Sequence, residues 1–124
     1  MTDVRFTEVG DRVYVLRYPV LDVNVTLVVG DDAALLVDTL STPRQAAELA
    51  AAAQAAKSRP WSVVNTHHHF DHCFGNAALA GDPSRPVYAH EATVRLLRDE
   101  AEQVRERAYR ELLPTQPELA AELA

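Results

Sequence analysis

Four of the chain's five histidines and one aspartate occur in a single six-residue stretch, HHHFDH. In an extended segment, residues two apart point to the same side, so His67 and His69 can direct their imidazoles at one cation while His68 faces elsewhere. A turn after them can bring Asp71 and His72 close by. Neutral imidazole and carboxylate are ligand types that Zn²⁺ accepts. The spacing therefore predicts a metal centre.

The elements around this cluster are expected to hold its side chains in place. Residues 61–64 (WSVV) predict a short strand directly before it, and a helix is expected over about residues 72–79 after it. Asp38 follows the apolar run 33–37. It is either an ordinary turn residue or a hydrogen-bond partner of a ligand imidazole, and both interpretations stay open.

Three other residues could in principle bind a metal but are expected to have other roles. The side chain of His68 is expected either to be exposed to solvent or to contact the metal ligands without binding the metal itself. Cys73 is expected to be a small buried hydrophobic residue, as free cysteine commonly is. His90 is expected to be structural.

The hydrophobic pattern predicts a mixed α/β protein. Strands are expected over residues 4–9, 12–17, 24–29, 33–37, 61–64 and 86–89. Helices are expected over residues 43–57, about 72–79 and 91–113, with Ser-Thr-Pro at residues 41–43 as the start signal of the first. A turn is expected at residues 81–83, and a short Ala/Leu/Glu stretch follows Pro117.

The H-x-H-x-D-H spacing resembles the metal-binding motif of the metallo-β-lactamase superfamily. Residues 63–66 (VVNT) resemble the strand ending in Thr that precedes that motif, and residues 74–76 (FGN) the segment that follows it. Residues 35–39 (LLVDT) resemble the family's strand ending in Asp, and residues 87–91 (VYAHE) the strand after the motif helix. The resemblance covers roughly residues 4–97, with glyoxalase II-like hydrolases as the nearest subgroup.

The resemblance implies that His67 and His69 bind a first zinc ion and that Asp71 and His72 bind a second. In the family, a hydroxide bridging the two metals attacks a carbonyl or phosphoryl centre, so no serine or cysteine nucleophile is needed. Asp71 can also accept a hydrogen bond from that hydroxide, which makes it the candidate catalytic residue. His and Asp ligands also suit iron and manganese. The implied function is zinc-dependent hydrolysis of a small-molecule ester, thioester, lactam or phosphoester.

The family fold is a four-layer αβ/βα sandwich of two similar halves. Residues 1–124 are expected to form a single, incomplete domain of this kind, a mixed sheet with helices on one face, because the family's remaining ligands come from a later part of its domain. The alternative is a truncated or split half without independent catalysis, which needs a complementary half-domain or a second copy. Such a half is expected to expose an apolar sheet face at Val13, Val15, Val25 and Leu27.

The amino-acid composition and net charge exclude several other classes of protein. The chain has 124 residues, of which 48% are hydrophobic and 24% charged, which is typical of one globular domain. A formal charge of −6 argues against nucleic acid or an anionic membrane as a partner. No apolar run approaches the roughly 18 residues of a membrane helix, and the start lacks a signal-peptide pattern. With a single cysteine, these features predict a cytoplasmic protein.

Overall fold

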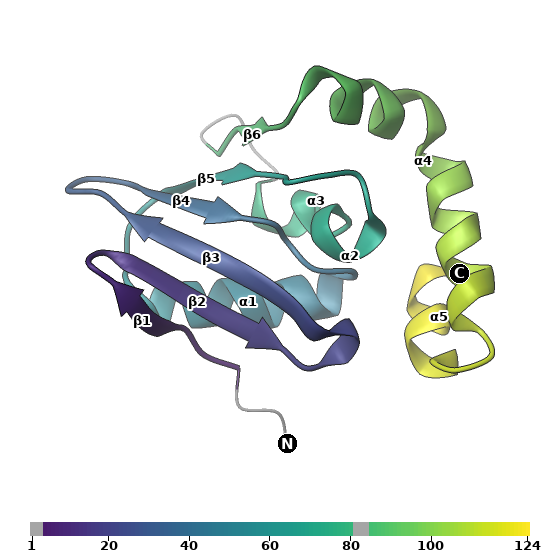
Figure 1. Ribbon diagram of the computed structural model, residues 1–124, viewed down its shortest axis with the longest axis horizontal. Coiled ribbons are helices and arrows are strands. Elements are labelled where there is room, and N and C mark those ends of the chain that lie inside the picture. The colour runs from purple at the N-terminus through teal and green to yellow at the C-terminus, as the bar shows by residue number, and fades with distance from the viewer. Residues whose placement is uncertain (1–3, 81–84) are drawn as a thin grey trace.

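The computed structural model describes residues 4–80 and 85–124, and within them the strands form one six-stranded mixed sheet (Figure 1). The strands lie in sequence order: β1 (Thr7–Gly10), β2 (Val13–Tyr18), β3 (Val23–Val29), β4 (Ala34–Val37), β5 (Trp61–Val64) and β6 (Val87–Tyr88). Strands β1 to β4 pair antiparallel, whereas β4, β5 and β6 pair parallel. The carboxyl ends of β4 and β5 therefore meet at the same end of the sheet.

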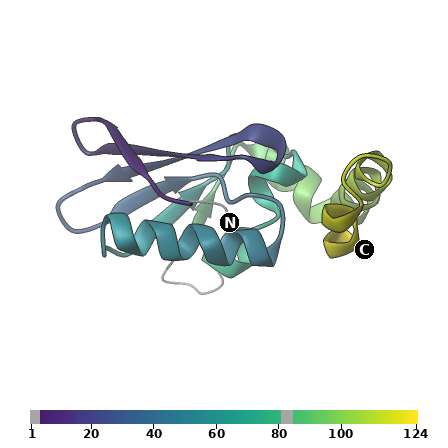
Figure 2. The same ribbon diagram turned by 90° about the horizontal axis from the view of Figure 1, so that it is seen from below.

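The helices cover one face of this sheet and one end of it. They are the 3₁₀ turn η1 (Val20–Asp22), α1 (Pro43–Ala56), α2 (Phe70–Cys73), α3 (Asn76–Leu79), α4 (Glu91–Leu112) and α5 (Pro117–Leu123). Helix α1 runs along one face, as the two views show (Figures 1 and 2). The hydroxyl of Thr42 caps α1 by accepting the backbone N–H of Gln45, and Pro43 occupies its first turn. The expected mixed α/β architecture is confirmed.

The main core lies between the sheet and α1. Strand β3 alternates, so that Val23, Val25, Leu27 and Val29 are buried while the residues between them are more exposed. The strand register places Leu16 beside Val25 and Leu36 beside Leu27 on the same face. Ala46, Leu49 and Ala53 of α1 complete the contact. Each fully buried Leu or Val side chain contributes about 1.5–3 kcal/mol to the free energy of folding.

The opposite face of the sheet carries a row of half-buried side chains. The register aligns Val15, Thr26, Val37 and Val64 across four strands, and α1 lies behind the sheet as this face is viewed in Figure 1. Of the residues expected to be exposed, Val13 and Val15 lie on this face but are half-buried, whereas Val25 and Leu27 are buried on the opposite face, so the expectation was wrong for them. The reason is the register, because Val15 pairs with Thr26 and not with Val25.

Helices α4 and α5 form a second packing unit at the end of the sheet (Figure 2). Ala108, Leu112, Leu119, Ala120 and Leu123 are buried together, with Leu21, Phe70 and Phe74 packed against them. Helix α4 is bent at Glu100, whose φ and ψ are −131° and 23°. Among the described residues, no helix combines the length and the apolar character that crossing a bilayer requires.

The segment after the histidine cluster differs from the expected single helix over residues 72–79. The structure has two short helices, α2 and α3, with Gly75 between them. Gly75 lies so close to the preceding loop that a Cβ built on it would sit 2.0 Å from the carbonyl oxygen of Thr39. The chain therefore breaks its helix where it passes under this loop. The turn expected at residues 81–83 lies outside the described residues.

Candidate metal centre

The candidate ligands lie on the loop that follows β5, beside the loop that follows β4. The backbone N–H of Asp38 donates to the carbonyl of Val64 at 2.9 Å, which extends the parallel pairing of these strands. The N–H of Thr39 donates to the carbonyl of His72 at 3.0 Å. In sheets of parallel strands, ligands bind in the crevice beyond the carboxyl ends. The histidine cluster occupies that position.

Three predicted ligand imidazoles lie together in the structure. The ring centroid of His67 is 4.5 Å from that of His69 and 4.2 Å from that of His72. Asp71 Oδ2 lies 3.8 Å from His72 Nε2. His68 is next to this group, with its ring centroid 5.0 Å from that of His69. The strand–turn–helix geometry inferred from the spacing thus brings the four predicted ligands to one place.

Asp38 is the residue that holds this loop together. Its carboxylate accepts the Thr66 N–H at 2.7 Å and the Thr66 hydroxyl at 2.8 Å, and it lies 2.7 Å from His72 Nδ1. The residue is 2% exposed and has a left-handed backbone, with φ of 71°. That conformation is uncommon outside glycine, although Asp and Asn adopt it more easily than other residues. Of the two interpretations of Asp38, the structure supports the imidazole partner.

The hydrogen bonds fix which ring nitrogens remain available for a metal. The Thr66 hydroxyl uses its proton on Asp38, so it accepts from Nδ1 of His67, 2.7 Å away. Nδ1 of His72 likewise donates to Asp38. In the neutral form, each imidazole then carries its proton on Nδ1, which leaves Nε2 available to a metal. Burial, followed by the neighbouring His72 and His69, lowers the pKa of His67, which favours the neutral ring that a metal needs.

A partly buried pair of amide side chains supports the backbone of the cluster. Asn65 and Asn76 donate to each other's side-chain oxygens at 3.0 and 2.7 Å, and the Thr39 hydroxyl donates to Asn76 at 2.8 Å. The Asn65 amide also donates to the carbonyl of His72 at 3.3 Å. The sequence analysis included Thr66, Thr39 and this pair in segments that resemble the family but assigned them no role. For Thr39, Asn65 and Thr66, the available signal was their position just after two apolar strands.

Comparison with known proteins places this geometry in a family. The sequence model of the metallo-beta-lactamase superfamily matches residues 18–122. The chain belongs to that superfamily. No curated protein matches it in sequence. The resemblance noted from the H-x-H-x-D-H spacing is confirmed, and so is the expected fold, part of a metallo-β-lactamase domain.

Solved metallo-β-lactamases share the fold over most of this chain. The enzyme from Erythrobacter litoralis is 29% identical with a TM-score of 0.62, and the match covers 77% of this chain and 45% of that one. The enzyme from Hirschia baltica is 26% identical with a TM-score of 0.66, covering 81% and 49%. FIM-1 from Pseudomonas aeruginosa, solved in a mono-zinc form, is 25% identical with a TM-score of 0.65, covering 83% and 47%. The chain thus spans about half the length of these metallo-β-lactamases.

The side chains of the histidine cluster are of the types that bind zinc, the metal expected for this metal-dependent hydrolase fold. Three imidazoles and a carboxylate are zinc ligands, and two of the imidazoles present a free Nε2. Within residues 4–80 and 85–124, however, no group of three or more His, Cys, Asp or Glu side chains already has a metal-binding arrangement. The donor atoms are therefore of the types that zinc binds, but these side chains do not form a closed coordination shell in this structure.

The other residues of metal-binding type have structural roles. Cys73 is 3% exposed, and its thiol contacts the carbonyls of His68 and His69. Burial raises the pKa of Cys73 to about 12, so the thiol stays protonated. His90 caps α4, because its Nδ1 accepts the backbone N–H of Ala92 at 3.0 Å.

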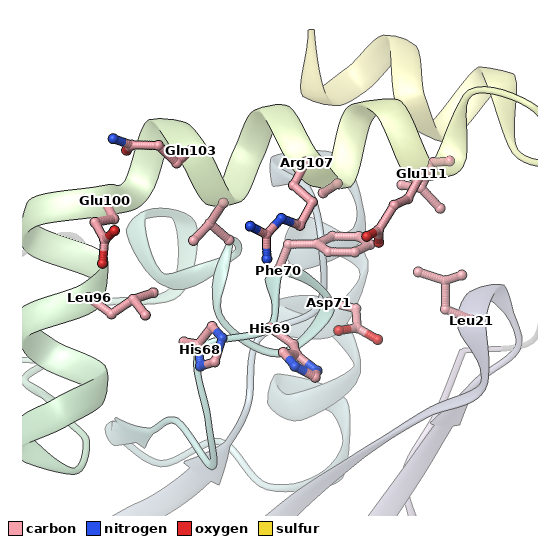
Figure 3. Close-up of a pocket in the computed structure, with 13 residues that line it drawn as sticks. Leu21, His68, His69, Phe70, Asp71, Leu96, Glu100, Gln103, Arg107 and Glu111 are labelled. Carbon is pink, nitrogen blue, oxygen red and sulfur yellow. The ribbon is translucent and has the colours of Figure 1, made fainter.

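A cavity of about 620 Å³ lies between the cluster and α4 (Figure 3). His68, His69 and Asp71 line it on the side of the loop, and α4 supplies much of the other side. The cavity gives a small molecule access to the part of the motif that carries His69 and Asp71.

Proposed function

We propose that this chain carries the metal-binding loop of a zinc-dependent hydrolase that acts on small molecules. His67 and His69 are assigned to one metal position, and Asp71 and His72 to a second. The observation that carries the proposal is the convergence of three imidazoles, two of which keep Nε2 free through the hydrogen bonds to Asp38 and Thr66. Iron or manganese would suit the same donors.

The chemistry divides between the metal and the residues of this chain. When bound, zinc polarises a scissile carbonyl or phosphoryl group and supplies a nucleophile at neutral pH. The carboxylate of Asp71 is assigned to accept a proton of the attacking water and to orient that water. Asp38 positions His72 and, through Thr66, His67. The proposed substrates are esters, thioesters, lactams or phosphoesters, which share an electrophilic centre that water can attack.

A second candidate function is a half-site that needs a partner. Two observations favour it: the described residues form no complete coordination shell, and the sheet face that carries Val15, Val37 and Val64 has no helix from this chain packed along it in Figure 1. A complementary half-domain, or a second copy of this chain, would then supply the missing ligands. We place either form in the cytoplasm, where a reduced Cys73 thiol is stable.

Zinc content and hydrolysis, measured together, test both candidates. The purified chain is equilibrated with zinc, its metal is counted by mass spectrometry, and generic thioester, lactam and phosphodiester substrates are assayed. His67→Ala should lose zinc and any turnover. His90→Asn, which keeps a capping side chain on α4, is the matched control and should lose neither.

The outcomes separate the two candidates. Two zinc ions per monomer with turnover that His67→Ala abolishes would establish an enzyme complete in this chain. Weak zinc binding without turnover, restored by a second chain, would establish the half-site. Zinc binding that is unchanged by substitution of His67 or His72 would contradict both.

A further inference from the structure

Arg107 differs from Arg98, Arg105 and Arg110 on the same helix, α4. It lines the cavity beside the candidate metal centre, and among the described residues it takes part in no ion pair or hydrogen bond. Other arginines of the helix are neutralised by carboxylates close by in sequence: Arg98 by Asp99 at 2.9 Å, Arg105 by Glu102 at 3.0 Å and Arg110 by Glu106 at 2.6 Å. An exposed, unpaired guanidinium that lines a cavity is an available anion-binding group.

The cavity has the composition of a binding site for a small amphiphilic molecule. Its side walls include Leu96, Val104 and Phe70, and Figure 3 shows Arg107 extending from α4 toward the loop that carries His69 and Asp71. Ligand sites are commonly apolar with a few convergent polar groups that fix orientation. A molecule here would contact an apolar wall, a cation at one end and the candidate metal ligands at the other.

Two carboxylates bear on the charge of this space. Glu100 and Glu111 also line the cavity, one on each side of Arg107 along the helix, and neither forms an ion pair with it in the described structure. Their negative charge offsets the long-range attraction of Arg107 for an anion. Recognition of an anion would therefore depend on direct contact with Arg107. A guanidinium is suited to such contact because its N–H groups form a planar fork that matches the oxygens of a carboxylate or phosphate.

We propose that Arg107 binds an anionic group of the substrate, so that this site takes acyl or phosphoryl compounds with a carboxylate or phosphate at a distance from the scissile bond. This inference rests on the proposed function for the identity of the scissile bond. Arg107 is then a specificity-determining residue, supplied by α4 and separate from the predicted metal ligands.

Binding to the purified chain, before zinc is added, tests the anion site without hydrolysis. Three probes share an aromatic ring that suits the apolar wall: benzoate, phenyl phosphate and neutral benzamide. Amide chemical shifts of α4 in two-dimensional NMR report their affinities. We expect benzoate or phenyl phosphate to bind about tenfold more tightly than benzamide, and the tighter of the two identifies the anion. Equal binding of all three probes would overturn the inference.

Two variants locate the effect. Arg107→Met removes the charge and keeps a long side chain, and it should abolish the preference for the anionic probes. Arg110→Met removes a paired arginine of the same helix and should leave the preference unchanged. A preference that survives in Arg107→Met, or that falls equally in both variants, would show that Arg107 is not the binding residue.

A hydrolysis experiment on the zinc-loaded chain separates this inference from the proposed function. It compares kcat/KM for the nitrophenyl half-ester of adipic acid with that for neutral nitrophenyl hexanoate. We expect the charged ester to be preferred, Arg107→Met to remove that preference and Arg110→Met to keep it. Turnover of both esters without preference would refute the role of Arg107 alone. Absence of turnover, with the NMR preference intact, would refute hydrolysis by this chain without a partner and leave the anion site supported.

Discussion

Oδ2 of Asp38 lies 2.7 Å from Nδ1 of His72, which links the end of β4 to a candidate metal ligand on α2. The same carboxylate accepts two hydrogen bonds from Thr66, at the start of the histidine cluster. One buried charge therefore sets the orientation of the loop at both of its ends. Its left-handed backbone shows that the fold maintains this arrangement at some conformational cost.

Asp38→Asn should weaken zinc binding while preserving the backbone. Asn also tolerates the left-handed conformation, but its amide has a single acceptor oxygen for three donors. We expect zinc affinity to fall about 10–100-fold, as for other partners of ligand imidazoles. We also expect a loss of about 1–3 kcal/mol in the free energy of unfolding. Competition with a chromophoric chelator and urea denaturation measure the two effects.

The control for this substitution is Asp31→Asn, which removes an exposed carboxylate paired with Arg12. It should leave zinc affinity unchanged and cost less than about 1 kcal/mol. A folded Asp38→Asn protein with unaltered zinc affinity would show that Asp38 does not position His72.

Gly75→Ala should destabilise the fold. The added Cβ would meet the carbonyl oxygen of Thr39 at 2.0 Å and the Cβ of Ala46 at 3.0 Å. Since Thr39 is itself bonded to the carbonyl of His72, the loops must move apart. We expect urea denaturation to show a free energy of unfolding lowered by an amount near the upper end of about 1–3 kcal/mol. Gly10→Ala, where the nearest atom is 3.9 Å away, should change stability by about 0.5 kcal/mol or less. Equal effects of the two substitutions would contradict the close approach.

The ion pair between Arg44 and Glu122 should make the attachment of α5 to α1 sensitive to acid. The guanidinium donates to both carboxylate oxygens, at 3.1 and 2.9 Å, and this bonding lowers the pKa of Glu122 from 4.5. A carboxylate with a depressed pKa in the folded state stabilises the fold above its unfolded pKa, and this stabilisation disappears as the pH falls through the folded value.

Glu122→Gln tests this pH dependence. Near pH 7 it should lower the free energy of unfolding by at most about 1 kcal/mol, because the pair is partly exposed. Well below pH 4.5 the variant and the original chain should be equally stable, as both side chains are then neutral. Glu106→Gln, which breaks a pair within α4, is the control for loss of a surface carboxylate. If the Glu122→Gln variant remained less stable than the original chain in acid, the loss of stability would come from packing and not from the ion pair.

The thiol of Cys73 should resist modification in the folded protein. Burial raises its pKa from 9.0 to about 12, and the charges of Asp38 and Asp71 act in the same direction. Because the thiolate is the reactive form, we expect its reaction with an aromatic disulfide at pH 8 to be roughly a hundredfold or more slower than in urea. Ser58→Cys in a Cys73→Ala background provides an exposed thiol for comparison. Comparable rates for the two folded proteins would contradict the burial of Cys73.

The local order of elements around the cluster could be predicted from the sequence. The strand at residues 61–64 follows from apolar patterning and is present as β5, whereas the helix expected from about residue 72 begins at Phe70 and ends at Cys73. The long helix expected over residues 91–113 is found at Glu91–Leu112. These features depend on contacts close in sequence, which periodicity and capping residues encode directly.

Features set by long-range contacts could not be predicted in the same way. The face on which Val25 lies depends on its register with β2, and the break between α2 and α3 depends on the distance from Gly75 to Thr39. The hydrogen bonds of Thr66 with Asp38 and His67 require two loops to meet. The assignment of His67, His69, Asp71 and His72 as metal ligands stays a prediction.

Phe70 links the histidine cluster to the packing unit of α4 and α5. Its ring packs into the small core of α4 and α5, and in the sequence it stands between His69 and Asp71. Any loosening of the C-terminal helices therefore removes support from the backbone that carries two candidate ligands, while α1 and the sheet keep their own contacts. Heat or denaturant should thus impair metal capture at milder conditions than those that melt the strands.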